Sequence, residues 1–112
     1  MITVVESYRL KPAYAPHALQ VLQELDDLLG PNAHTNAGHV GHARFLQDAS
    51  EPAQVCLVYQ WRDHKSFMDL VRNEEKLLGD FIAKYCSGPR SIQIHNELPV
   101  EVDHDEDERA NV

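Results

Sequence analysis

The segment from Val55 to Trp61 constrains this chain more than any other, because it is apolar on both faces of the β-strand that it predicts. Side chains alternate along a strand, so its two faces carry different residues. One face holds Val55, Leu57, Tyr59 and Trp61, and the other holds Cys56 and Val58. Helices usually cover one face of the sheet in a small domain, and we expect a second copy of the chain to cover the other.

Besides this segment, the sequence predicts two helices and three further strands. We expect strands over 2–10, 39–47, 55–61 and 91–98, a first helix that follows Pro12 and runs to Leu29, and a second helix over 64–85. Gly30 and Pro31 are predicted to end the first helix and to open a loop over 32–38. The order predicts the α+β class with a ferredoxin-like βαββαβ fold: one four-stranded antiparallel sheet, strands one and three central, and both helices on one face.

The sequence of the second helix has two notable features, a capping residue at its start and a polar segment in its middle. Asp63 is a suitable N-cap, because its carboxylate can accept hydrogen bonds from free N–H groups of the first turn. Farther on, five polar residues over 72–76 interrupt the apolar face of the helix. This interruption indicates a kink or a short break.

The face of the sheet without helices is predicted to be the surface of assembly. We expect it to include some of Ile2, Val4 and Tyr8 together with Cys56 and Val58. An exposed apolar patch of this size is typical of an interaction site. We therefore predict a two-fold homodimer through the open sheet face, in which two sheets close a shared barrel.

Composition divides the chain into a domain over 1–98 and an acidic, flexible tail over 99–112. Six acidic residues against one arginine give the tail a net charge of −5, out of −8 for the whole chain. The chain has no basic stripe, which argues against a nucleic-acid partner. Without an 18-residue apolar run or a signal-peptide pattern, no membrane partner is expected. The two cysteines lack a disulfide pattern, and we expect a cytoplasmic protein.

The motif Trp61-Arg62-Asp63-His64-Lys65-Ser66-Phe67, after an apolar strand, resembles the antibiotic biosynthesis monooxygenase family of dimeric α+β barrels. Within that family the chain looks most similar to the small anthrone oxygenases of aromatic polyketide pathways. A second stretch, Gly38-His39-Val40-Gly41-His42, is similar to the family's entry into its second strand. The resemblance covers roughly residues 2–98, and its motifs are short, so it is a better guide to fold than to chemistry.

The resemblance implies oxygenation of a small aromatic polyketide or quinol by O₂ without a cofactor. Trp61 would form the wall against which the substrate stacks, and Phe67 of the same motif is included among the substrate-binding residues. The sequence departs from the anthrone oxygenases at two positions. The anthrone oxygenases usually carry asparagines at the positions that align with Ser7 and Leu57, and those amides position substrate oxygens, which a leucine cannot do.

The remaining candidate site residues come from their chemistry and place in the pattern. Tyr59 and Tyr85 have hydroxyl groups that could donate hydrogen bonds into a cavity, although buried tyrosines commonly only satisfy a backbone carbonyl. His42 is the candidate general base, since a neutral imidazole can remove an activated proton near neutral pH. In a regular strand His42 shares a face with Arg44, which we include as a substrate-binding residue.

A metal site at His34, His39 and His42 is the less favoured interpretation. In a regular strand His39 and His42 would project to opposite faces. No phosphate loop, nucleophile elbow or Cys-x-x-Cys motif is present. Two alternatives to a monooxygenase remain open: a polyketide cyclase or isomerase that uses proton transfer only, and a non-catalytic small-molecule-binding dimer of the same fold.

Overall fold

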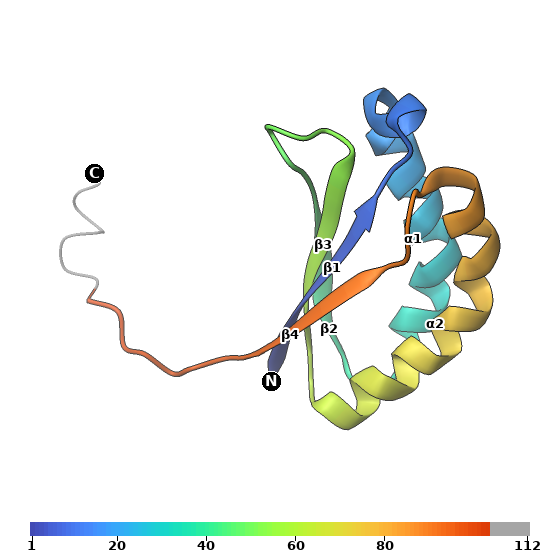
Figure 1. The fold of residues 1–112 in the computed structure, drawn as a ribbon. Coiled ribbons are helices and arrows are strands. Elements are labelled where there is room, and N and C mark those ends of the chain that lie inside the picture. The colour runs from blue at the N-terminus through green and yellow to red at the C-terminus, as the bar shows by residue number, and fades with distance from the viewer. Residues whose placement is uncertain (104–112) are drawn as a thin grey trace.

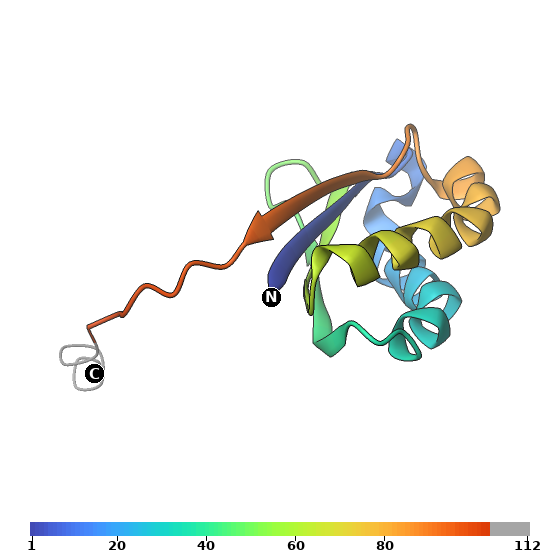
Figure 2. The same cartoon turned by 90° about the horizontal axis from the view of Figure 1, so that it is seen from below.

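The computed structural model describes residues 1–103, and its elements follow the predicted order (Figure 1). They are β1 (Ile2–Arg9), the short 3₁₀ helix η1 (Pro12–His17), α1 (Ala18–His34), β2 (His39–Gln47), β3 (Gln54–Trp61), α2 (His64–Tyr85) and β4 (Ser91–Asn96). The sheet is antiparallel with the order β2-β3-β1-β4, so strands one and three are central. The ferredoxin-like fold is confirmed, and Figures 1 and 2 show both helices on the same face of the sheet.

The register between β1 and β3 decides which residues face the helices. Ile2 lies opposite Trp61, and Tyr8 lies opposite Val55. Directly paired residues of antiparallel strands project to the same face, so Ile2, Val4 and Tyr8 lie under the helices with at most 5% of their surface exposed. The prediction that they belong to the open face is wrong.

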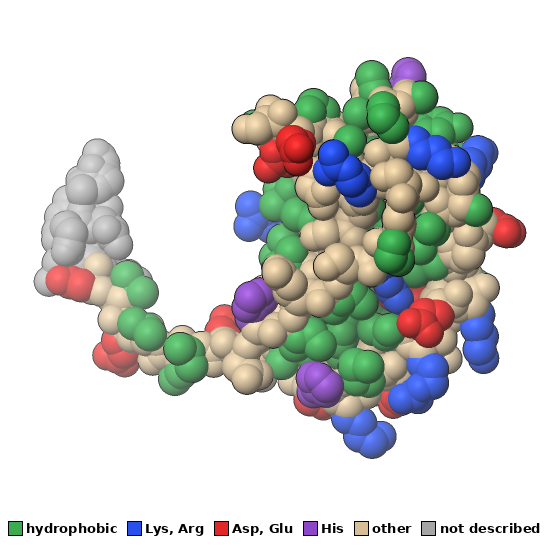
Figure 3. Space-filling model, in the orientation of Figure 1, with side chains coloured by type: hydrophobic (Ala, Val, Ile, Leu, Met, Phe, Trp, Pro, Cys, Tyr) green, Lys and Arg blue, Asp and Glu red, His purple; other side chains and the backbone are tan. Residues whose placement is uncertain are grey.

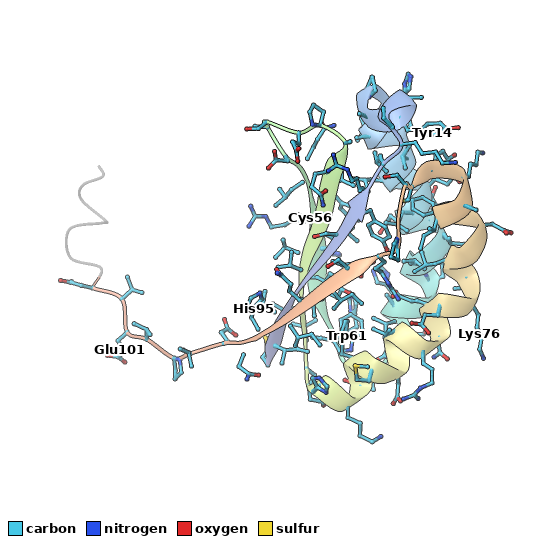
Figure 4. All side chains as sticks on the ribbon, viewed as in Figure 1. Tyr14, Cys56, Trp61, Lys76, His95 and Glu101 are labelled. Atoms are coloured by element: carbon cyan, nitrogen blue, oxygen red, sulfur yellow. The ribbon has the colours of Figure 1, made fainter. Side chains whose placement is uncertain are left out.

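The open face is the side of the sheet away from the helices. The strand pairing places on it the side chains of Thr3, Val5, Ser7, Val40, Arg44, Leu46, Cys56, Val58, Gln60, Gln93 and His95. Figure 4 shows Trp61 on the helix side and His95 on the other. The apolar part of the open face is therefore centred on Val5 and Val58, which are paired with each other.

The first helix extends past the predicted stop at Gly30 and Pro31 and ends at His34. A proline inside a helix removes one backbone donor and crowds the carbonyl one turn earlier, and Pro31 lies in the last turn of α1, where few residues follow it. The following turn is stabilised by packing, because Ala33 contacts the hydrophobic cluster around Trp61. Thr35 then closes the helix by donating its hydroxyl to the carbonyls of Pro31 and Asn32.

The second helix runs without interruption from His64 to Tyr85, so the predicted break at residues 72–76 is absent. Asp63 caps it as expected, since its carboxylate accepts from the Ser66 N–H at 2.8 Å. The polar segment contains one residue that turns inward: Glu74 lies between Leu70 and Leu78 on the buried stripe and is 3% exposed. A buried partner for its carboxylate makes this arrangement compatible with an unbroken helix.

The segment after β4 extends away from the body on the side of the open face (Figures 1 and 3). Its apolar residues Leu98, Val100 and Val102 are largely exposed, and Glu101 and Asp103 follow the two valines. Residues 104–112, most of the predicted flexible tail, lie outside the described part of the chain. Within residues 1–103 neither helix has an apolar run long enough to cross a bilayer.

Candidate functional site

A cavity of about 230 Å³ lies between the helices and the β2–β3 half of the sheet. Its wall is formed by Trp61 and Leu70, its floor by Glu6, Tyr59 and Glu74, and its mouth by three histidines. The cavity therefore joins an apolar wall, a buried acidic floor and a partly exposed basic mouth. Each of these parts is built by a different local feature of the chain.

The wall depends on the close approach of Gly38 to the indole of Trp61. Trp61 is 2% exposed, and its ring meets that of Tyr59 edge to face at 5.9 Å between centroids. A Cβ atom on Gly38 would overlap the indole, so only glycine fits there. The indole Nε1 is buried and has no hydrogen-bond partner in residues 1–103. The indole thus lines the cavity as a tightly packed ring, and its Nε1 is buried on the side of Gly38.

The floor is a buried network of two carboxyl groups and one guanidinium group. Tyr59 donates its hydroxyl to Glu6 Oε1 at 2.7 Å, and Tyr8 donates to Glu6 Oε2. Arg90 Nη1 donates to Glu6 Oε2 at 3.3 Å and to Glu74 Oε1 at 2.7 Å. With both carboxyl groups ionised the network would carry one uncompensated negative charge, which is costly in a buried position.

This charge balance perturbs the titration of the floor. Burial and the negative charge of Glu6 raise the pKa of Glu74 to about 7, although the hydrogen bond and charge of Arg90 oppose the rise. Burial and the same carboxylate raise the pKa of Tyr8 and of Tyr59 far above the usual value, so both hydroxyl groups stay protonated. Burial alone would lower the pKa of Arg90, but the two glutamates outweigh it and raise that pKa. Glu74 is therefore the member of the floor that titrates near neutral pH.

The mouth is formed where β2 bulges against β3. Val40 pairs with Gln60 and Arg44 with Val58, so three residues of β2 stand opposite the single Tyr59. Gly41 permits this bulge, because it adopts a φ of 64° that other residues disfavour. The bulge separates His42 from Arg44, which lies on the open face, so the prediction that the two share a face is wrong.

The bulge also brings three imidazoles together. The ring centroids of His34 and His39 lie 4.5 Å apart, and those of His34 and His42 lie 6.4 Å apart. The prediction that His39 and His42 diverge is thus wrong, since it assumed a regular strand. Burial and the nearby His34 and His42 lower the pKa of His39. No group of three residues suited to hold a metal ion is found in the described chain.

The structure brings together four of the predicted site residues, namely Trp61, His42, Leu57 and Tyr59. Ser7 and Arg44 lie on the open face and do not line the cavity. Phe67 is fully buried behind the wall, in the cluster that contains Trp61. Tyr85 lies in the other core cluster, where its hydroxyl donates to Glu24 Oε1 at 2.6 Å.

Sequence reasoning missed the three charged residues of the floor. The strand-one residue that faces the cavity is Glu6 rather than Ser7, because a shift of one position along a strand reverses the face. The sequence signal for Glu6 was the position of this residue between Val4 and Tyr8 in the alternating pattern of the strand. Glu74 likewise falls on the apolar stripe of α2 at helical spacing, whereas Arg90, outside any regular element, carries no comparable signal.

Comparison with solved structures finds close matches to this fold. A structure described as an antibiotic biosynthesis monooxygenase aligns with a TM-score of 0.65 at 15% identity, over 88% of this chain and 100% of its own. A protein of Bordetella bronchiseptica, whose assignment to the same family is itself provisional, gives a TM-score of 0.68 at 13% identity over 87% and 96%. The likeness is one of fold.

Other structural neighbours have no assigned activity. A Nitrosomonas europaea protein of unknown function aligns with a TM-score of 0.67 at 14% identity, over 91% of this chain and 93% of its own. No family model matches the sequence, and no curated protein matches it. The comparisons therefore establish an architecture shared with monooxygenase-like proteins, and the chemistry has to be argued from the cavity.

Proposed function

We propose that this protein is a cofactor-independent monooxygenase that adds one oxygen atom from O₂ to a small aromatic substrate of the quinol class. The observation that carries the proposal is the cavity itself, in which an indole wall faces a floor that contains a carboxyl group with a pKa of about 7. An aromatic ring can stack on the wall while a hydroxyl group reaches the floor. The fold shared with monooxygenase-like proteins supports the same assignment.

The size of the cavity favours a substrate of one or two rings over a three-ring anthrone. A closed apolar cavity of about 150 Å³ accommodates one benzene molecule. The cavity here measures about 230 Å³ and opens at the histidine mouth. One ring is enclosed against Trp61, and a second ring extends toward the mouth. Leu57 adds to the apolar lining, where an amide would be needed to hold an additional carbonyl oxygen.

The proposed reaction requires only a base and oxygen. Removal of a phenolic proton leaves an electron-rich anion, and a ring carbon of that anion reacts with O₂. Loss of water then gives the hydroxylated quinone, so that one quinol and one O₂ yield one hydroxyquinone and one H₂O. The buried wall shields the anion from water, which favours this course over release of peroxide. His42 and Glu74 both line the cavity and are the two candidate bases.

The proposal includes a homodimer through the open face and a cytoplasmic location. Val5 and Val58 lie paired at the centre of that face and are only half-buried in the single chain. A second copy related by a two-fold axis would cover them. The two cysteines, Cys56 and Cys86, are both free, which fits a reducing compartment such as the cytoplasm.

The test is the oxidation of 1,4-naphthohydroquinone, a two-ring quinol. We expect 2-hydroxy-1,4-naphthoquinone to form with consumption of one O₂ per quinol and without H₂O₂. Trp61→Phe should lower kcat/KM roughly tenfold, because a smaller ring leaves part of the wall unfilled. Tyr14→Phe, an aromatic change outside the cavity, is the matched control. Formation of only 1,4-naphthoquinone and H₂O₂, at the rate seen without protein, would refute the proposal.

The acidic floor also favours a second candidate, a cyclase or isomerase of polyketide-like substrates. Glu74 can accept a proton in the cavity and return it as the neutral acid, and such a reaction needs no oxygen. Product formation from a polyketide-like substrate under anaerobic conditions would support this alternative. Ligand binding without turnover under either condition would support the non-catalytic dimer.

A further inference from the structure

The floor of the cavity holds two carboxyl groups that differ in their surroundings. Glu6 and Glu74 are 1% and 3% exposed, and both line the cavity. They come from β1 and α2, and the side chain of Arg90, 6% exposed, bridges them through Nη1. The guanidinium group lies between two buried carboxyl groups and is hydrogen-bonded to both. A buried charge without such a partner would strongly destabilise the fold.

Hydrogen-bond donors are distributed unequally between the two carboxyl groups. Glu6 accepts from three side chains, namely Tyr8, Tyr59 and Arg90. Glu74 accepts from Arg90 alone, through Oε1. Donors stabilise the ionised form of an acceptor, and the donors of this network are concentrated on Glu6. The second oxygen of Glu74 has no donor in residues 1–103, which leaves it available for a proton.

We propose that Glu74 is the proton acceptor of this site and that Glu6 and Arg90 are the residues that position it. This inference rests on the proposed function and names its base. A substrate hydroxyl at the floor gives its proton to the Glu74 carboxylate, the O–H bond breaks, and its electron pair remains on the substrate oxygen. Glu74 becomes the neutral acid, which removes the uncompensated negative charge of the floor.

His42 is less suited than Glu74 to accept the proton of the substrate hydroxyl. It lies exposed to solvent at the mouth of the cavity, where its ring centroid is 6.4 Å from that of His34. Glu74 instead lies on the buried side, next to Leu70 of the wall. The charged groups that act on Glu74 are Glu6 and Arg90. As the pH rises through about 7, Glu74 loses its proton and becomes able to accept one.

Binding of 2-naphthol tests the assignment without any oxygen chemistry. This two-ring phenol stays neutral between pH 5 and about 8.5, so a pH-dependent affinity reports on the protein. We expect the wild-type affinity to rise about tenfold as the pH passes 7, because a hydrogen bond to a carboxylate is stronger than one to a neutral acid. Glu74→Gln should remove this rise, whereas His42→Gln and the exposed neighbour variant Glu75→Gln should keep it.

Turnover of 1,4-naphthohydroquinone gives the second measurement. Glu74→Gln should lower kcat at least 100-fold, the usual effect of a lost general base, and should abolish the rise of activity with pH. Glu74→Asp, which keeps a carboxylate, should retain that rise and serves if the glutamine variant does not fold. Either a pH-independent affinity in the wild type or a rise that persists in Glu74→Gln would overturn the assignment. Wild-type protein that binds 2-naphthol as expected but does not oxygenate the quinol would refute the proposed function alone.

Discussion

Replacement of Gly38 by alanine should destabilise the wall of the cavity, although the same change usually has little effect in a loop. An added Cβ would lie closer to Trp61 and to the Ser66 hydroxyl than real Cβ atoms come to any neighbour. The backbone cannot retreat, because the Gly38 N–H donates to Asn36 Oδ1 at 2.7 Å and its carbonyl accepts from the Arg62 N–H at 2.9 Å. The indole must therefore move.

The expected cost follows from overpacking. An extra methyl group in a well-packed core typically costs about 1–3 kcal/mol. Alanine also lowers the conformational entropy of the unfolded chain, and this effect offsets about 0.4–1 kcal/mol of the loss in stability. Gly79→Ala is the matched control, since it lies on the exposed side of α2 with no atom within 4 Å of the added Cβ. Alanine in an exposed helix should stabilise by about 0.5–1 kcal/mol.

Urea denaturation followed by fluorescence measures both effects, because Trp61 is the only tryptophan of the chain. We expect a lower midpoint and a red-shifted native emission for Gly38→Ala, together with weaker binding of 2-naphthol. Gly79→Ala should raise the midpoint and leave the emission unchanged. A Gly38→Ala protein as stable as the wild type, with the same emission maximum, would show that the loop does not press on the indole.

Two further predictions concern the surface of the fold. Val58→Glu on the open face should convert the proposed dimer to monomer in sedimentation measurements, whereas Glu75→Gln on α2 should not; a wild-type monomer would contradict the dimer itself. Removal of all residues after Leu98 should leave the thermal midpoint within about 2 °C of the wild type, because β4 ends at Asn96 and Val100 and Val102 are largely exposed. A larger fall would mean that the tail packs on the domain.

Hydrophobic periodicity was sufficient to predict the order of elements, and the ferredoxin-like fold that this order matches implied the central place of β1 and β3. A two-residue period marks β4, where Ile92 and Ile94 alternate with Gln93 and His95, and a stripe at helical spacing marks α2. Burial of one face imposes such repeats on a sequence. The same patterns could not predict the extent of α1. Pro31 is a local signal for a helix end, but the packing of Ala33 against the Trp61 cluster is a tertiary interaction that outweighs it.

The site was predicted only in part, because its chemistry depends on which residues meet across the sheet. The family resemblance indicated Trp61, and the chemistry of its hydroxyl group indicated Tyr59. Sequence reasoning assigned the strand-one polar contact to Ser7, since nothing local shows that Ile2 pairs with Trp61 and thereby turns Glu6 inward. It also separated the histidines, since the bulge at Gly41 is a property of two paired strands.

The sequence by itself therefore determined the fold class, through local repeats of apolar residues, and its resemblance to a known family implied the aromatic wall. Only the tertiary structure decided that Glu6 and Glu74, 68 positions apart in the chain, share Arg90 in one buried floor. The pKa of a carboxyl group depends on its burial and on the charges around it, and both arise from contacts between distant segments. The acid–base character of this cavity is for that reason a property of the folded chain.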